Sequence, residues 1–215
     1  MRLVVYDLDG TLVDSREDIA RAVNHMLQSL GSPELPRAVI ERFVGHGLHH
    51  LVRHCLGTED PRRIEKGAKI YRDYYGKHML DNTRLYPGVF EVLVYFKSRK
   101  QAVITNKPNP YAREILVALG AGDFFSDIVA GDSDFPKKPD PAALLSIMQR
   151  EKMNPAETLF VGDSAIDVET GRRAGGHVVV VTHGFTAEKD LRAARPDAVV
   201  PDFGGFLKLA QSKGW

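Results

Sequence analysis

The chain has 215 residues, 43% of them hydrophobic, and its 29 basic and 28 acidic side chains leave a formal net charge of +1. This length supports a sizeable core and one or two domains, while the balanced charge argues against intrinsic disorder and against a surface built to coat nucleic acid. The single cysteine, Cys55, cannot form an internal disulfide, and no segment has the ~20 apolar residues of a membrane span. We therefore expect a cytoplasmic protein without a nucleic-acid or membrane partner.

Short runs rich in valine, isoleucine and aromatic residues predict strands at five places. These runs are Leu3–Leu8, Ala102–Thr105, Ile128–Ala130, Thr158–Val161 and His177–Thr182. Proline-led helical stretches, Tyr111–Leu119 and Ala142–Arg150, separate the later runs. The tail predicts an edge strand, Ala198–Val200, and a closing helix, Phe203–Ser212. Alternating strands and helices predict an α/β fold with a Rossmann-like parallel sheet between two layers of helices.

A long stretch without strand signals separates the first two runs. Its apolar residues recur at helical spacing, most clearly over Ser15–Leu30. The further helical stretches are Arg37–Leu56, Pro61–Leu80 and Pro87–Arg99, the last with Pro87 in its first turn. We expect a helical cap, residues 15–81, inserted after the first strand of a core formed by residues 1–14 and 82–215.

Two carboxylates follow the first run. Alternation along a strand places Asp7 and Asp9 on one side where the strand ends, and Gly10 allows the sharp turn that follows. Carboxylates this close repel each other unless a cation lies between them, and Mg²⁺ prefers carboxylate and carbonyl oxygens. The plain alternative is a turn with solvated aspartates.

The fourth run also ends in an acid, Asp163, which can complete a metal site. Ser164 follows it, and Asp167 lies one turn along a nascent helix, where both can hold metal ligands in place by hydrogen bonds. Alternatively, Asp167 simply stabilises the first turn of that helix.

Neutral and positive groups follow the other runs. Thr105 and Asn106 both offer hydrogen bonds to an anion. Lys138 lies in a proline-rich loop before a helix, as a rigid cation for phosphate or as an ordinary surface lysine. Each signal is weak alone, but all of these groups follow strands, at the edge where open α/β sheets bind ligands.

Together, these segments resemble the four motifs of the haloacid dehalogenase superfamily. The matching segments are Asp7-Leu8-Asp9-Gly10-Thr11, Thr105-Asn106, Lys138-Pro139 and Gly162-Asp163. The helical insert, with its segment 44–47, further resembles the phosphoglycolate phosphatase group. This resemblance implies a Mg²⁺-dependent phosphomonoesterase that acts on a small phosphorylated metabolite, first of all 2-phosphoglycolate, as a monomer or homodimer.

The resemblance also implies a role for each residue of the site. Asp7 would attack phosphorus to form a phosphoaspartate, and Asp9 would protonate the leaving alkoxide and later activate water. Thr105 and Lys138 would stabilise charge on the transferring phosphoryl oxygens. Mg²⁺ would take the side chains of Asp7 and Asp163 and the backbone carbonyl of Asp9.

Other functions share this core. A pyrophosphatase, a sugar-phosphate phosphatase or a phosphoglucomutase would differ from the first hypothesis in the cap and the leaving group. A module that binds a phosphorylated ligand without catalysis would keep the fold, although every expected catalytic position is filled. The acid at Asp9 disfavours a dehalogenase.

The cap adds one candidate loop and one histidine row. We expect Gly45, His46 and Gly47 to bring cap backbone to the substrate, the alternative being an ordinary helix start. His46, His50 and His54 recur at i, i+4 and i+8, on one face of a helix. We interpret that row as solvated or cleft-lining rather than as a metal or pH-sensing cluster, and the cap tyrosines as packing residues.

Overall fold

A computed structural model of the chain describes every residue, from Met1 to Trp215. Six parallel strands form one sheet in the order β5-β4-β1-β6-β7-β8. They are β1 (Leu3–Tyr6), β4 (Lys100–Ile104), β5 (Asp127–Val129), β6 (Thr158–Gly162), β7 (His177–Val181) and β8 (Ala198–Val200). All six strands confirm the predicted runs, and β8 lies at the sheet edge as expected.

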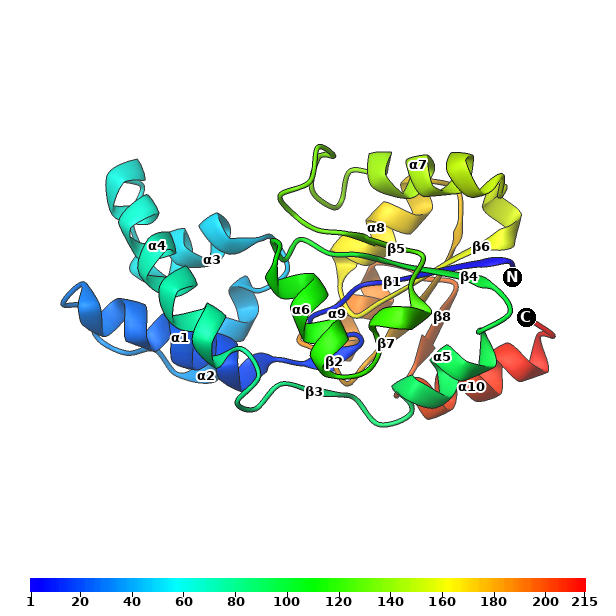
Figure 1. Cartoon of the computed structure of the whole chain (residues 1–215), viewed down its shortest axis with the longest axis horizontal. Coiled ribbons are helices and arrows are strands. Elements are labelled where there is room, and N and C mark those ends of the chain that lie inside the picture. Colours follow the sequence, from blue (N-terminus) through cyan, green and yellow to red (C-terminus); the bar gives the residue numbers. More distant parts are fainter.

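Alternation along the central strand β1 buries both faces of the sheet. Val4 and Tyr6 pack into one hydrophobic cluster and Leu3 and Val5 into another. On the first face lie α5 (Val89–Tyr95), α6 (Tyr111–Ala118) and α10 (Phe203–Ser212). On the second face lie α7 (Ala142–Glu151), α8 (Ala165–Arg173) and α9 (Glu188–Ala193). Figure 1 shows the resulting three layers, which confirm the Rossmann-like α/β prediction.

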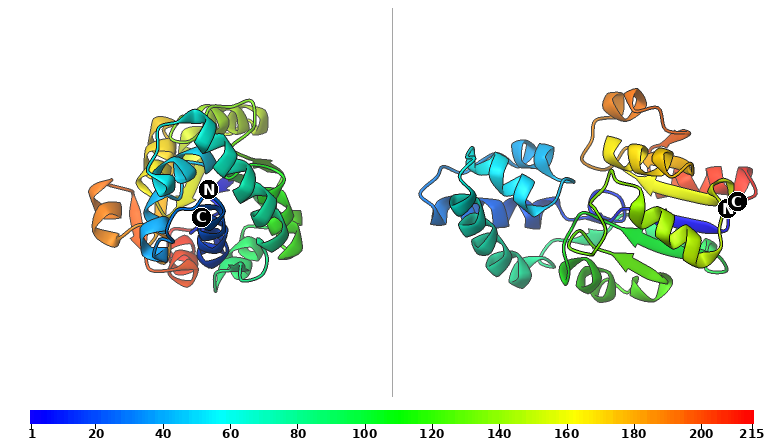
Figure 2. Two further views of the ribbon diagram at one scale, coloured as in Figure 1. Left: turned by 90° about the vertical axis from the view of Figure 1, so that its left-hand side faces the viewer. Right: turned by 90° about the horizontal axis from the view of Figure 1, so that it is seen from above.

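Four further helices lie together beyond one end of the sheet (Figures 1 and 2). They are α1 (Arg16–Ser29), α2 (Arg37–Ile40), α3 (Leu48–Leu56) and α4 (Pro61–His78), all within the helical cap, residues 15–81. Three short 3-10 turns complete the chain: Glu41–Phe43, Gly122–Phe124 and Pro155–Glu157. None of the helices is both long and apolar enough to cross a bilayer.

A two-stranded antiparallel ribbon marks the passage between the helical cap and the sheet. It pairs β2 (Val13–Asp14) with β3 (Arg84–Leu85). Asp18, near the start of α1, reinforces this passage, because its buried carboxylate accepts hydrogen bonds from the backbone and side chains of Asn82 and Thr83 at 2.8–3.1 Å. The chain thus leaves and re-enters the core at two adjacent points.

Two helix predictions were wrong in their bounds. The predicted helix Arg37–Leu56 is interrupted, because Gly45 (φ +106°) and Gly47 (φ +90°) adopt left-handed backbone that a right-handed helix does not contain. The helix predicted over Pro87–Arg99 begins only after Gly88, at φ +85°, and ends at Tyr95, so Pro87 lies outside it. The ribbon β2–β3 was not predicted, since two residues per strand carry no periodic signal.

Candidate active site

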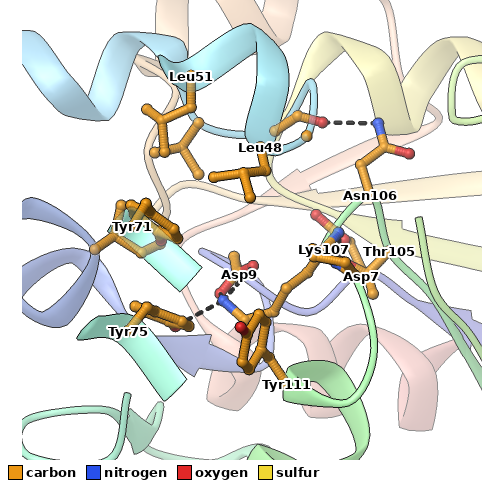
Figure 3. A pocket seen from close by; sticks show the side chains of 15 residues that line it. Asp7, Asp9, Leu48, Leu51, Tyr71, Tyr75, Thr105, Asn106, Lys107 and Tyr111 are labelled. Atoms are coloured by element: carbon orange, nitrogen blue, oxygen red, sulfur yellow. Dashed lines mark hydrogen bonds and ion pairs between the residues drawn. The ribbon is translucent and has the colours of Figure 1, made fainter. Parts of the chain in front are cut away.

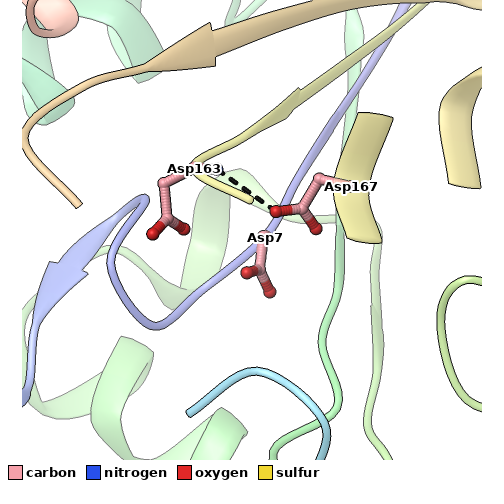
Figure 4. Close-up of side chains that lie close together, drawn as sticks. All are labelled: Asp7, Asp163 and Asp167. Carbon is pink, nitrogen blue, oxygen red and sulfur yellow. Dashed lines mark hydrogen bonds between the residues drawn. The ribbon is translucent and has the colours of Figure 1, made fainter. Parts of the chain in front are cut away.

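The predicted polar side chains meet at the carboxyl ends of neighbouring strands. Because β4, β1 and β6 are adjacent in the sheet, Thr105, Asp7 and Asp163 follow them side by side. Carboxylate oxygens of Asp7, Asp163 and Asp167 lie within 4.8 Å of one another, and all three residues are buried (Figure 4). Residues more than 150 positions apart in the chain therefore form one acidic cluster.

Lys138 lies against this cluster, from the loop before α7. Its Nζ is 2.7 Å from Asp7 Oδ1 and 2.7 Å from Asp167 Oδ1, and its side chain is 3% exposed. Burial alone would lower the pKa of Lys138, but Asp167 and Asp7 raise it above its usual value. The lysine thus stays charged, and the alternative of an ordinary surface lysine does not apply.

Two acids of the cluster, Asp7 and Asp163, have raised pKa values. Burial raises the pKa of Asp7 to about 7, although Lys138 opposes the shift. Burial also raises the pKa of Asp163 well above its usual value, and the charges of Asp167 and Asp7 add to this effect. Three carboxylates therefore share one ammonium group, and full ionisation leaves an excess of two negative charges.

A divalent cation fits that excess and those ligand atoms. Asp167 is already committed, because its Oδ1 contacts Lys138 and its Oδ2 accepts hydrogen bonds from the backbone N–H groups of Asp163 and Ser164. Ser164 and Asp167 also form a capping box at the start of α8. Asp163 accepts one hydrogen bond on each oxygen and contacts no ammonium group, so Asp7 and Asp163 keep lone pairs for a metal, and their hard oxygen atoms suit Mg²⁺.

Glycines make room for the Asp163 carboxylate. Gly10 has φ +85°, and a Cβ atom there would lie 2.4 Å from Asp163 Oδ2. A Cβ atom on Gly184 would lie 2.2 Å from the same oxygen. The carboxylate is held between these loops by hydrogen bonds from the Thr11 hydroxyl and the Phe185 backbone N–H, each 2.8 Å long. The turn after Asp9 is therefore shaped around a group of the neighbouring strand.

Asn106 is placed differently from our expectation. Its side-chain N–H groups donate to the carbonyl oxygens of Gly45 at 2.8 Å and Lys138 at 3.0 Å, and its Oδ1 accepts from the Lys138 backbone N–H at 2.9 Å. Both amide hydrogens are thus used within the protein. Asn106 lines the pocket beside Thr105, but in this structure its amide hydrogens position the Lys138 loop and the cap loop instead of being offered to an anion.

A pocket with about 550 Å³ of empty space opens between the sheet edge and the helical cap (Figure 3). The core contributes Asp7, Asp9, Thr105, Asn106, Lys107, Pro108 and Tyr111, and the helical cap contributes Ile19, Val44, Gly45, Gly47, Leu48, Leu51, Tyr71 and Tyr75. The two expected catalytic aspartates therefore face a cavity whose opposite wall is mostly apolar.

The cap loop reaches this pocket only in part. Gly45 and Gly47 line it, as expected for backbone that approaches a ligand. His46 does not: it is exposed, and its ring packs at a tilt against His50 with a centroid distance of 4.4 Å. His50 packs in the same way against His54 at 4.0 Å, and the ring nitrogen atoms of the three residues do not converge as metal ligands would.

Sequence reasoning missed a second contact that joins the two walls, besides the one between Asn106 and Gly45. Lys107 Nζ donates to both carboxylate oxygens of Asp9, at 2.9 and 3.1 Å, and to the Tyr75 hydroxyl of α4 at 2.7 Å. The alternation that places Asp7 and Asp9 carries no information about a lysine in a loop, and Tyr75 reads as a packing residue. The only sequence signal is the position of Lys107, directly after Thr105-Asn106 and before a proline, as Lys138 also precedes one.

Comparisons with known proteins agree with this geometry. Residues 4–181 match the family model of the haloacid dehalogenase-like hydrolases. The phosphoglycolate phosphatase of Nitrosospira multiformis is 37% identical over 98% of this chain and 96% of its own, and that of Pseudomonas putida is 38% identical over 96% of this chain and 78% of its own.

A solved structure extends the likeness to three dimensions. The crystal structure of a predicted phosphoglycolate phosphatase from Haemophilus somnus superposes with a TM-score of 0.93 at 30% identity, covering 98% of both chains. These findings confirm the resemblance that the four motifs indicated. The chain belongs to the haloacid dehalogenase-like hydrolase family, and within it is similar to the phosphoglycolate phosphatases.

Proposed function

We propose that this protein is a Mg²⁺-dependent phosphatase that hydrolyses 2-phosphoglycolate through a phosphoaspartate intermediate on Asp7. The observation that carries the proposal is the buried cluster of Asp7, Asp163 and Asp167 with Lys138, of which Asp7 faces the pocket. The family membership and the names of the similar proteins support the reaction and the substrate.

Asp7 and Asp163 would hold the metal through their side chains, and Asp9 through its backbone carbonyl. Mg²⁺ bound there would offset the repulsion between the carboxylates and an incoming phosphate dianion. Asp7, as the nucleophile, forms a bond to phosphorus while the bond to the leaving oxygen breaks. Lys138 and Thr105 stabilise the charge on the phosphoryl oxygens, and Asp167 with Ser164 keeps Lys138 and the Asp163 loop in place.

Asp9 provides the proton. Its side chain lines the pocket and accepts hydrogen bonds from Lys107 and from the Ser15 hydroxyl at 2.6 Å. Once a substrate separates it from Lys107, Asp9 in its protonated form would protonate the leaving alkoxide, and in the second step it would regain the proton from the water that hydrolyses the phosphoaspartate.

The helical cap, residues 15–81, would close over the core, residues 1–14 and 82–215, to exclude water during the reaction. The apolar side chains of α3 that face the pocket support this role (Figure 3). We include a cytoplasmic location, for which the single, buried cysteine is support, and a monomer or homodimer without a nucleic-acid or membrane partner.

Phosphate release from a panel of small phosphoesters tests the proposal. The panel contains 2-phosphoglycolate, pyrophosphate and sugar phosphates, each with Mg²⁺ and again with a chelator. We expect Mg²⁺-dependent release with a preference for 2-phosphoglycolate, and no turnover by the Asp7→Asn variant, whose amide is not a nucleophile. A preference for pyrophosphate, a rearranged sugar phosphate without free phosphate, or substantial activity of Asp7→Asn would contradict it.

A further inference from the structure

Lys107 is the only positively charged side chain among the residues that line the pocket. Its residue exposure is 8%, and each of its three N–H groups has an acceptor, two on Asp9 and one on Tyr75. Burying an ammonium group is unfavourable unless such partners compensate it. The pocket therefore contains one fixed positive charge on the side where Asp9 and the helical cap meet.

The two ends of the pocket offer different chemistry. Thr105 and Asp7, a member of the buried acidic cluster, line the pocket at the sheet edge. Lys138 contacts Asp7 there. On the cap side the wall consists largely of apolar and aromatic groups, among them Leu48 and Leu51 of α3 (Figure 3). A sugar leaving group would leave most of its hydroxyl groups against this wall without partners, which is unfavourable. An anionic leaving group finds one partner there, Lys107.

We propose that Lys107 binds the carboxylate of the leaving group and thereby selects phosphomonoesters of 2-hydroxy acids, of which 2-phosphoglycolate is the smallest. This inference rests on the proposed phosphatase function and assigns its substrate recognition to one residue. Tyr75 completes the site: its hydroxyl accepts from Lys107 and keeps its own hydrogen for a ligand carboxylate.

The distances restrict the length of the leaving group. Lys107 Nζ lies within hydrogen-bond distance of the Asp9 carboxylate, the group that protonates the leaving oxygen. A substrate that contacts both residues must hold its carboxylate close to its ester oxygen. In a 2-hydroxy acid a single carbon atom separates the two groups. The substrate carboxylate would replace Asp9 on Lys107 and leave Asp9 to face the ester oxygen.

A pair of matched substrates tests this assignment. Ethyl phosphate has a methyl group where 2-phosphoglycolate has its carboxylate. We would measure kcat and KM for both with Mg²⁺, using the wild type, Lys107→Met and, as control, Lys66→Met, which removes the same charge from an exposed lysine outside the pocket. We expect Lys107→Met to reduce the preference for 2-phosphoglycolate by about 10- to 100-fold, mainly through KM, and Lys66→Met to keep it.

The ratio of kcat/KM for the two substrates distinguishes recognition of the carboxylate from an effect on Asp9. If Lys107→Met lowers kcat/KM equally for both, the lysine acts only through Asp9 and the inference is wrong. Lys107→Arg keeps the charge and should retain part of the preference, and melting curves show whether each variant folds.

A measurement on the wild type alone does not depend on any variant. The phosphate ester of 3-hydroxypropionate places its carboxylate one carbon further away, so its kcat/KM should fall below that of 2-phosphoglycolate. If the wild type has equal kcat/KM for 2-phosphoglycolate and ethyl phosphate, the role of Lys107 is overturned while the phosphatase function remains intact. A wild type that releases phosphate from none of these esters would refute the proposed function itself, and this inference with it.

Discussion

The two walls of the pocket are built in different ways. At the sheet edge, buried charges are held by strand ends and by hydrogen bonds to backbone, as for Asp163 between Thr11 and Phe185. On the cap side, apolar groups of α3 and α4 surround the polar contact between Lys107 and Tyr75. A preorganised charged wall suits a reaction common to a family, and the apolar wall suits the choice of leaving group.

Removing Lys138 should damage the charged wall most. Lys138→Met keeps much of the side-chain volume but leaves Asp7 and Asp167 without their shared partner. We expect kcat for 2-phosphoglycolate to fall by about 10²- to 10³-fold, because a buried donor to the phosphoryl group is lost. Steady-state phosphate release measures this effect, with Lys66→Met, at an exposed lysine outside the pocket, as the control. A loss below tenfold would show that Lys138 organises the carboxylates without stabilising the transferring group.

The charged wall was also the predictable one. Strand positions follow from continuous apolar runs, and the residues just after a parallel strand must lie at the ligand-binding edge of the sheet. Asp7, Asp163 and Lys138 could therefore be brought together from the sequence. Asn106 could not be placed, because its partners, the carbonyl groups of Gly45 and Lys138, depend on how two loops fold.

The cap wall depends on contacts between distant parts of the chain. The interruption between α2 and α3 escaped prediction because apolar residues continue at helical spacing on both sides of it. Only the positive φ angles of Gly45 and Gly47 reveal the break. The pairing of Lys107 with Tyr75 depends on where α4 lies relative to the sheet, and no local periodicity encodes that distance.

Substitution of Asp18 tests how strongly its hydrogen bonds hold the helical cap to the core. Asp18→Ala leaves four donor groups without their acceptor, two on the exposed Asn82 and two on the buried Thr83. We expect a loss of about 3 kcal/mol in the free energy of unfolding, measured by denaturant titration. Glu17→Ala, on an exposed part of the same helix turn, should lose less than about 1 kcal/mol. Equal losses would mean that the Asp18 network does not anchor the cap.

The pH dependence of this loss provides an internal check on Asp18. Burial alone would raise the pKa of Asp18, but the hydrogen bonds from Asn82 and Thr83 outweigh it and lower the pKa below its usual value. The stabilisation is therefore present above the usual pKa of 3.8 and disappears as the pH falls through the lower, folded value. The difference in the free energy of unfolding between the wild type and Asp18→Ala should disappear only under strongly acidic conditions.

Metal and pH should act together on the charged wall. Because burial raises the pKa of Asp7 to about 7, its contribution to stability with a chelator present is complete below the usual pKa of 3.8 and is lost as the pH rises to about 7. Mg²⁺ binds the ionised form, so its stabilising effect should grow over the same range, to several degrees in melting temperature. Asp7→Asn lacks this titration and is the control. A Mg²⁺ effect independent of pH would contradict the assignment.

The smallest effect is expected at His46. Its side chain is exposed and packs against His50 outside the pocket, whereas Gly45 and Gly47 on either side line it. His46→Ala removes a solvated ring and leaves the glycine backbone unchanged, so kcat/KM for 2-phosphoglycolate should change by less than about twofold. A tenfold loss in kcat/KM would show that cap closure turns His46 into the pocket. The cap wall would then contain a further polar side chain, and the contrast between the two walls would be weaker.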